Sequence, residues 1–264
     1  MYKILDAHCH IFPDKVAHRA ADAIGKFYDA KMCMDGRADT LIEEGALAGF
    51  THYLVHSVAT TPKQVSRINH FIAETVAQSG GKMTGFGAMH PESEDMKADI
   101  EELISLGLKG VKLHPDIQGY KSDDYRMLKI YELCEKYSLP VLIHCGDFRY
   151  DNSNPNRIAP ILDIYENLTV IGAHFGGYSV WEQASEKLAG YKNFYVDTSS
   201  SLFALKKGEA EKIIGIYGDD RVLFGTDYPM WNPKEELDRF FALDLKEEQR
   251  RKILWENGAK LLNI

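Results

Sequence analysis

A short apolar segment followed by a longer amphipathic one recurs eight times along this chain, and few architectures accommodate such a recurrence. The apolar segments are rich in Val, Ile, Leu and aromatic residues and cover residues 2–8, 51–57, 83–89, 108–114, 139–145, 168–174, 193–199 and 221–227. Amphipathic stretches with capping residues at their ends separate them, such as residues 94–107 and 122–138. Eight successive strand and helix units predict a (β/α)8 TIM barrel of the α/β class.

A doubly wound open sheet is the competing architecture. It usually carries a glycine-rich phosphate-binding turn after its first strand, but residues 9–15 read CHIFPDK here. The chain has 264 residues, and no repeat, low-complexity tract or Pro/Gly/Ser-rich linker divides it. We therefore predict one domain over residues 1–264. The longest connection, residues 11–50, is a candidate lid beside the barrel mouth.

Charge and composition narrow the class of protein. The net charge of -8 and the lack of a basic run argue against a nucleic-acid surface. No run approaches the about 20 apolar residues of a membrane span, and no leader segment precedes the first strand. The four cysteines show no C-x-x-C spacing, which argues against a disulfide or zinc-ribbon scaffold. We expect a cytoplasmic protein that acts on small molecules.

Histidines gather at the ends of the predicted strands. His8 and His10 form an H-x-H pair in DAHCHIF, and alternation along a strand places both side chains on one face, where they suit a single metal ion. Seven of the ten histidines lie at such ends: His8, His10, His56, His90, His114, His144 and His174. The strand ends of a barrel converge on one face, which carries the active site in characterised examples.

Two further residues extend the predicted metal site. Asp227 ends the eighth strand, which neighbours the first strand in a closed barrel, so its carboxylate should lie beside His8 and His10. His144, at the end of the fifth strand, can complete the set from across the mouth. Asp197 ends the seventh strand and is a candidate hydrogen-bond partner for a ligand histidine. Zinc, manganese and iron all accept such nitrogen and oxygen donors.

Five motifs, in order along the chain, carry a resemblance to a known family. They are DAHCHIF, GVKLHP, VLIHCG, GAHFGG and LFGTDYP, between residues 6 and 229. Together they resemble the amidohydrolase superfamily, and more narrowly its amidohydrolase-2 branch of metal-dependent hydrolases and non-oxidative decarboxylases. The segment ILWENGAKLL, residues 253–262, also resembles the terminal helix of that branch. The similarity thus spans nearly the whole chain.

The resemblance implies roles for particular residues. His8, His10, His144 and Asp227 would hold the metal, and His174 would be a catalytic residue beside it. Elsewhere in the superfamily a carboxylated lysine bridges two metals, and Lys112 lies on the corresponding strand here. Relatives in this branch usually carry one metal despite a similar lysine. We therefore expect one divalent ion, with zinc as the first candidate and manganese or iron as alternatives.

Two residues are predicted to contact the substrate. His114 either faces the substrate or supports a metal ligand, and Arg149 follows the fifth strand closely and offers a planar fork for a carboxylate. His56 and His90 are expected to lie near the site without a role in it.

The same site is compatible with more than one reaction. In hydrolysis a bound metal lowers the pKa of water to about 7. Asp227 would then move the water's proton to the leaving group, and His174 would stabilise the oxyanion. The substrate would be a small carboxylate, lactone, ester or amide.

The alternatives are non-oxidative decarboxylation of an aromatic or enol acid, and a non-catalytic binding barrel. We favour hydrolysis, because decarboxylases that resemble this branch tend to be longer and often carry Glu in place of the first histidine. The filled metal positions argue against the binding barrel. A homodimer is expected by analogy with relatives.

Overall fold

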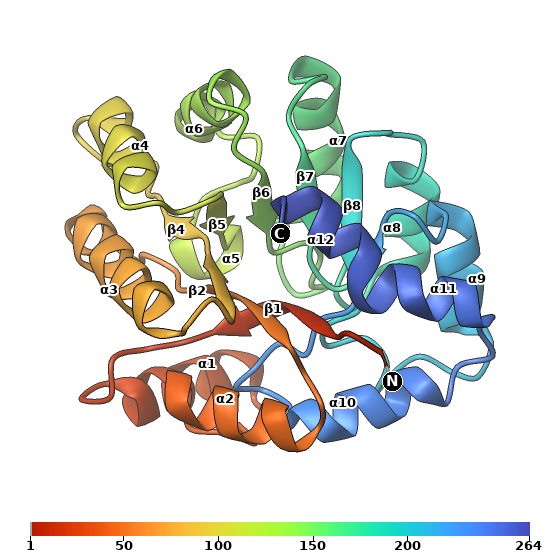
Figure 1. Cartoon of the computed structure of the whole chain (residues 1–264). Coiled ribbons are helices and arrows are strands. Elements are labelled where there is room, and N and C mark those ends of the chain that lie inside the picture. The colour runs from red at the N-terminus through yellow and green to blue at the C-terminus, as the bar shows by residue number, and fades with distance from the viewer. Residues whose placement is uncertain (1) are drawn as a thin grey trace.

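The structure, a computed structural model, describes residues 2–264 as a ring of parallel strands surrounded by helices (Figure 1). The strands are β1 (Leu5–His10), β2 (His52–His56), β3 (Met83–Gly85), β4 (Gly87–Ala88), β5 (Val111–Leu113), β6 (Val141–Ile143), β7 (Val170–Gly172), β8 (Phe194–Asp197) and β9 (Val222–Leu223). Each overlaps one of the eight predicted segments, although β1 continues two residues beyond the first segment, to His10. The β3 and β4 strands are two parts of the third segment, separated at Phe86.

Helices surround the ring on the outside (Figure 1). They are α1 (Ala17–Tyr28), α2 (Ala38–Leu47), α3 (Val65–Gln78), α4 (Met96–Ser105), α5 (Pro115–Gln118), α6 (Tyr125–Lys136), α7 (Pro155–Ile164), α8 (Trp181–Leu188), α9 (Glu209–Tyr217), α10 (Pro233–Phe241), α11 (Glu247–Arg251) and α12 (Asn257–Leu262). A short 3-10 turn, η1 (Pro62–Gln64), precedes α3, and a π-helical segment, η2 (Lys252–Glu256), joins α11 to α12.

Backbone hydrogen bonds close the ring. The β1, β2 and β3 strands pair in that order, and β4 to β9 pair in sequence order, all of them parallel. The last strand returns to the first, because Ala7 N donates to Phe224 O over 2.8 Å and His10 N donates to Tyr228 O over 2.7 Å. The predicted (β/α)8 barrel is therefore confirmed, and the doubly wound alternative, which leaves its sheet open, is excluded.

Local sequence sets the ends of the predicted helices. The Asp95 carboxylate accepts a hydrogen bond from Ala98 N at the start of α4, and the Asp124 carboxylate accepts one from Arg126 N at the start of α6. Such caps satisfy backbone donors that have no partner inside the helix. Gly107 follows α4 with a φ of 79°, a conformation that glycine adopts without steric cost.

Apolar side chains fill the barrel interior at the end opposite the predicted site. Leu5, Leu54, Leu142, Ile171 and Leu223 lie in one buried cluster. Burial of each such side chain contributes about 1.5–3 kcal/mol. Leu262 of α12 belongs to the same cluster, and α12 crosses the barrel in Figure 1. The polar strand ends are therefore confined to the other end of the barrel.

The connection between β1 and β2 covers that other end. Ile24 and Tyr28 of α1, together with Met32, line a cavity at the carboxyl ends of the strands. The segment that we single out as a candidate lid therefore lies over the barrel mouth. None of the helices formed by residues 2–264 is long and apolar enough to cross a membrane.

Candidate active site

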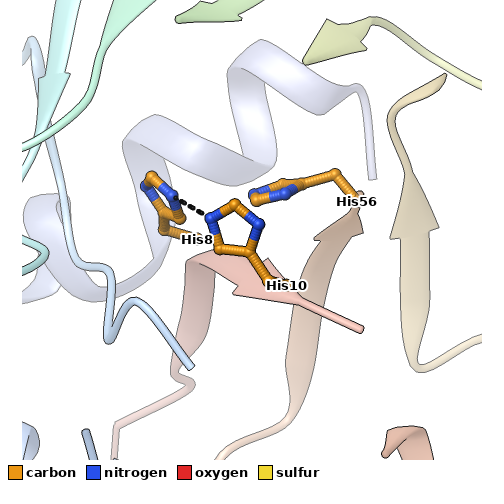
Figure 2. A group of neighbouring side chains, drawn as sticks. All are labelled: His8, His10 and His56. Carbon is orange, nitrogen blue, oxygen red and sulfur yellow. Dashed lines mark hydrogen bonds between the residues drawn. The ribbon is translucent and has the colours of Figure 1, made fainter. Parts of the chain in front are cut away.

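His8 and His10 lie at the end of β1 with their rings close together inside the barrel (Figure 2). The pairing register between β1 and β2 shifts between Asp6 and Cys9, so β1 carries one extra residue at this point. Such bulges re-aim side chains and are common next to active sites. The Nε2 atoms of His8 and His10 are 3.2 Å apart, and the H-x-H pair is thus brought together as predicted.

Asp227, which follows β9, brings its carboxylate to this pair. Its Oδ1 lies 3.4 Å from His8 Nε2 and 3.6 Å from His10 Nε2. The backbone of Asp227 has a φ of 60°, which is uncommon for a residue other than glycine. Such strained backbone often accompanies functional sites. The Ser200 hydroxyl donates a 2.5 Å hydrogen bond to Asp227 Oδ2 and fixes the second oxygen.

These three atoms fit a divalent ion. Imidazole nitrogens and carboxylate oxygens bind zinc at about 2.0–2.2 Å, so neighbouring donors of a tetrahedral ion lie about 3.3–3.6 Å apart. The observed separations of 3.2, 3.4 and 3.6 Å match that spacing. A point about 2 Å from each donor exists at the centre of the triangle. The residues present could therefore hold the metal that the sequence predicts.

A hydrogen bond to Asp197 orients His8. Its Oδ2 lies 2.8 Å from His8 Nδ1, and because a carboxylate only accepts, Nδ1 carries the proton and Nε2 presents its lone pair. Burial alone would raise the pKa of Asp197, but the interaction with His8 outweighs burial and lowers it. Contacts of this type hold metal ligands in the correct tautomer. The predicted hydrogen bond between Asp197 and a histidine of the site is confirmed.

Lys112 adds a third nitrogen to the group of His8, His10 and Asp227. Its side chain is buried, and Nζ lies 3.1 Å from His8 Nε2. Burial lowers the pKa of Lys112 to about 8. An ammonium group at this position hydrogen-bonds the lone pair that a metal would need, so Lys112 competes with a cation for His8.

His174 and His144 form a second pair beside the first. His174 Nδ1 lies 3.0 Å from the Ser199 carbonyl oxygen, which can only accept, so the proton is on Nδ1. His174 Nε2 lies 3.0 Å from His144 Nδ1, and the His174 ring stacks on His8 at 5.2 Å between centroids. The predicted catalytic residue is therefore next to the candidate metal ligands.

His144 contacts His174 and the neighbouring residues His114 and Asp116. Its ring stacks on His114 at 4.0 Å, and its Nε2 is buried, lies 3.5 Å from Asp116 Oδ2 and has no hydrogen-bond partner. Burial raises the pKa of Asp116 to about 6. The role of His144 as a metal ligand stays a prediction.

The two predicted substrate contacts have different surroundings. His114 lines the cavity, and its Nδ1 accepts a hydrogen bond from Ile117 N, so its Nε2 donates to the Tyr28 hydroxyl oxygen over 2.8 Å. Arg149 is held by Asp147, with 2.6 Å between Nη2 and Oδ2, and donates to Phe27 O at the end of α1. Its contact with a substrate stays a prediction.

Tyr28 is a cavity residue that the sequence does not single out. It ends α1, and its ring lies 5.8 Å from the ring of Tyr178 and under the guanidinium of Arg149. Burial raises the pKa of the Tyr28 hydroxyl. The only sequence signal for it is its place near the end of an amphipathic segment in the candidate lid.

The cavity itself is small and is lined by both apolar and polar side chains. Its volume is about 20 Å³, which is enough for about one water molecule. The lining comprises apolar side chains with Tyr28, and polar side chains from the strand ends: Ile24, Tyr28, Met32, Ile117, Pro229 and Met230, and His10, His114, His144, His174 and Asp227. A ligand larger than a water molecule can bind only after some of the lining side chains move.

The buried histidines make the metal-free protein sensitive to acid. Burial lowers the pKa of seven of them: His10, His52, His56, His90, His114, His144 and His174. The unfolded chain binds these protons below about pH 6.5 and the folded chain does not, so stability is lost as pH falls below that value. Burial raises the pKa of Asp6 and Asp116 to about 6 and that of Glu236 to about 7, so the folded chain binds protons at these three carboxyl groups and offsets part of this loss. The lowered pKa of Asp197 acts only below about pH 4.

We therefore expect the free energy of unfolding of metal-free protein to fall between pH 6 and 5, by about 1.4 kcal/mol per pH unit for each net proton taken up on unfolding. Urea titrations at pH 7.0, 6.5, 6.0, 5.5 and 5.0 measure this dependence. A free energy of unfolding that stays constant or rises on acidification across this range would show that these imidazoles are not buried in the neutral form.

Comparisons with known proteins agree with the barrel fold and with the family resemblance. A family model described as Amidohydrolase matches residues 5–264. The chain therefore belongs to the amidohydrolase-2 branch of the amidohydrolases and is an enzyme of that family. The family resemblance drawn from the five motifs is confirmed.

Individual relatives are distant. A gamma-resorcylate decarboxylase from Polaromonas sp. is 24% identical over 253 residues, which cover 75% of this chain and 76% of the relative. An uncharacterized TIM-barrel protein from Bordetella bronchiseptica has a TM-score of 0.80 at 25% identity, covering 99% of this chain and 98% of that one. A 5-carboxyvanillate decarboxylase from Novosphingobium aromaticivorans, solved with manganese and 4-hydroxy-3-methoxy-5-nitrobenzoic acid, has a TM-score of 0.79 at 14% identity, covering 100% and 96%.

Proposed function

We propose that this protein is a metal-dependent, non-oxidative decarboxylase of a small aromatic carboxylic acid. The observation that carries the proposal is the mixed lining of the cavity, which combines the apolar side chains of Ile24, Met32 and Ile117 with polar side chains that include His10 and Asp227. A flat ring suits the apolar side chains, and a carboxylate suits a cation held by the polar ones. The names of the decarboxylase relatives support this choice over hydrolysis.

We infer that the site takes one divalent ion. His8, His10 and Asp227 would hold it, with His144 as the further ligand that the family resemblance implies. Manganese becomes the first candidate in place of zinc, because a related decarboxylase contains it. When bound, a divalent ion supplies Lewis-acid stabilisation of negative charge on the substrate's oxygens.

The chain's own residues would manage the protons. With its proton fixed on Nδ1, His174 offers Nε2 as a base for a hydroxyl group of the substrate. Removal of that proton raises the electron density of the ring carbon that bears the carboxylate, and the protonated His174 delivers the proton to this carbon. The bond to the carboxylate then breaks and carbon dioxide leaves, while the product phenolate takes a proton from water and His174 is again neutral.

Hydrolysis, which we favour from the sequence, has weaker support than decarboxylation. The preference for hydrolysis rests on the short chain and on His8 in the first motif. Neither feature changes which substrates a metal held by His8, His10 and Asp227 can bind. Both reactions use the same ligands. A homodimer stays an expectation.

A substrate screen tests the proposed reaction. Protein loaded with Mn²⁺ is incubated with gamma-resorcylate, 5-carboxyvanillate and other hydroxybenzoates, and carbon dioxide release is measured together with the ultraviolet spectrum of the ring. We expect release from at least one acid, and none after removal of the metal with a chelator. Cleavage of esters, lactones or amides without any carbon dioxide release would instead establish a hydrolase.

A further inference from the structure

His56 is a buried histidine for which the proposed function has no role. It ends β2 directly beside β1, and its Cα pairs in register with that of His10. Its side chain is fully buried, and neither Nδ1 nor Nε2 has a hydrogen-bond partner among residues 2–264. Burial of an unpaired polar atom is costly, so a polar side chain with two such atoms calls for an explanation.

The other buried histidines in the described part of the chain differ from His56. Each of the seven has at least one hydrogen-bonded ring nitrogen: His8, His10, His52, His90, His114, His144 and His174. His52 begins the same strand, and its Nε2 is 2.8 Å from the Thr84 hydroxyl. Among these buried histidines, His56 is therefore the one whose ring nitrogens both lack a partner, and it lies at the end of β2 that faces the candidate metal centre.

The surroundings of His56 point to a cation as its partner. Its ring lies 4.5 Å from that of His10 and 4.9 Å from that of His8, nearly perpendicular to the first (Figure 2). One ring nitrogen from each of the three histidines can be chosen so that all lie within 4.8 Å of one another. Imidazole lone pairs that converge in this way repel each other unless a proton or a metal ion lies between them.

We propose that His56 is an additional nitrogen ligand of the divalent ion held by His8, His10 and Asp227. The inference rests on the proposed function, because it assigns a residue to the same metal. Neighbouring strands then supply the donors in sequence, with β2 beside β1 and β1 beside the segment that follows β9. Packing alone, or a trapped water molecule, is the competing explanation for His56.

Replacing His56 by leucine separates these explanations. Leucine has a similar volume and no nitrogen, so the variant removes both unpaired atoms and the proposed ligand together. We expect the metal-free His56→Leu protein to melt at or above the wild-type temperature, and its Kd for Mn²⁺, measured by calorimetric titration, to rise at least tenfold. The visible absorption spectrum of the Co²⁺-loaded protein should also change. If His56 only packs or holds water, the Kd and the spectrum will match those of the wild type, which would overturn the proposal.

The matched control is His52→Leu, on the same strand at the opposite end of the barrel. It leaves Thr84 without its partner, so its melting temperature should fall while its Kd for Mn²⁺ stays at the wild-type value. Should His56→Leu fail to fold, His56→Asn, which is smaller and polar, is measured by the same titration with the same expected loss. A wild-type protein that neither binds Mn²⁺ nor releases carbon dioxide contradicts the proposed function, whereas unchanged affinity in the His56 variant contradicts this inference alone.

Discussion

Replacement of Asp227 by asparagine is expected to weaken Mn²⁺ binding by at least about 100-fold and to reduce turnover below detection. Loss of residues that merely support metal ligands already costs about 10–100-fold in affinity, and Asp227 supplies the only carboxylate 3.4–3.6 Å from both His8 Nε2 and His10 Nε2 among residues 2–264. Asparagine keeps the shape and can still accept the hydrogen bond from Ser200, but its amide group then faces two imidazoles without a negative charge.

Metal content by elemental analysis and Kd by titration measure this effect. Asp220→Asn is the matched control. Asp220 is an exposed aspartate just before β9, so its substitution makes the same chemical change outside the cavity. Its metal content and turnover should equal those of the wild type. An Asp227→Asn protein that keeps one equivalent of metal would remove Asp227 from the ligand set.

His174→Asn is expected to keep its metal and to lose turnover by about 10²- to 10⁴-fold, the usual contribution of an acid or base catalyst. His174 is next to the donors, and its Nδ1 proton is committed to the Ser199 carbonyl oxygen. Its φ is 59°, and asparagine tolerates this left-handed conformation better than alanine does. The backbone that positions Asp197 and Ser199 should therefore remain in place.

The result is read from kcat and metal content together. His90→Asn serves as the control, since His90 is also buried at a strand end but does not line the cavity. Its kcat should stay within a few-fold of the wild type. Loss of metal and turnover together in His174→Asn would make His174 a ligand, contrary to the role proposed for it.

The barrel could be predicted because its signal is repeated. Each of the eight apolar segments overlaps an observed strand, and the alternation of strand with helix leaves few topologies. The strands are shorter than the predicted segments, often two to four residues, because residues beyond the paired backbone stay apolar and buried without joining the ladder. The break at Phe86 in the third segment depends on tertiary packing and has no local signal.

The site could be predicted only in part, because some of its features also depend on tertiary packing. His8, His10 and Asp227 could be grouped because strand order alone makes their strands neighbours. Tyr28 reaches the cavity through the packing of α1 over the mouth, which periodicity does not reveal. His56 was expected to have no role, because its position at a strand end says nothing about whether its nitrogens find partners. The prediction that Arg149 contacts the substrate rests on its position just after the fifth predicted strand, but its guanidinium forms an ion pair with Asp147, only two residues away.

Anomalous diffraction from crystals of Mn²⁺-loaded protein tests the metal centre most directly. We predict one peak per chain, about 2.1 Å from His8 Nε2, His10 Nε2 and Asp227 Oδ1, with one equivalent of manganese by elemental analysis. The cluster of His114, Asp116 and His144 also brings three donor groups together. A peak at that cluster, or no peak at any histidine, would contradict the assignment.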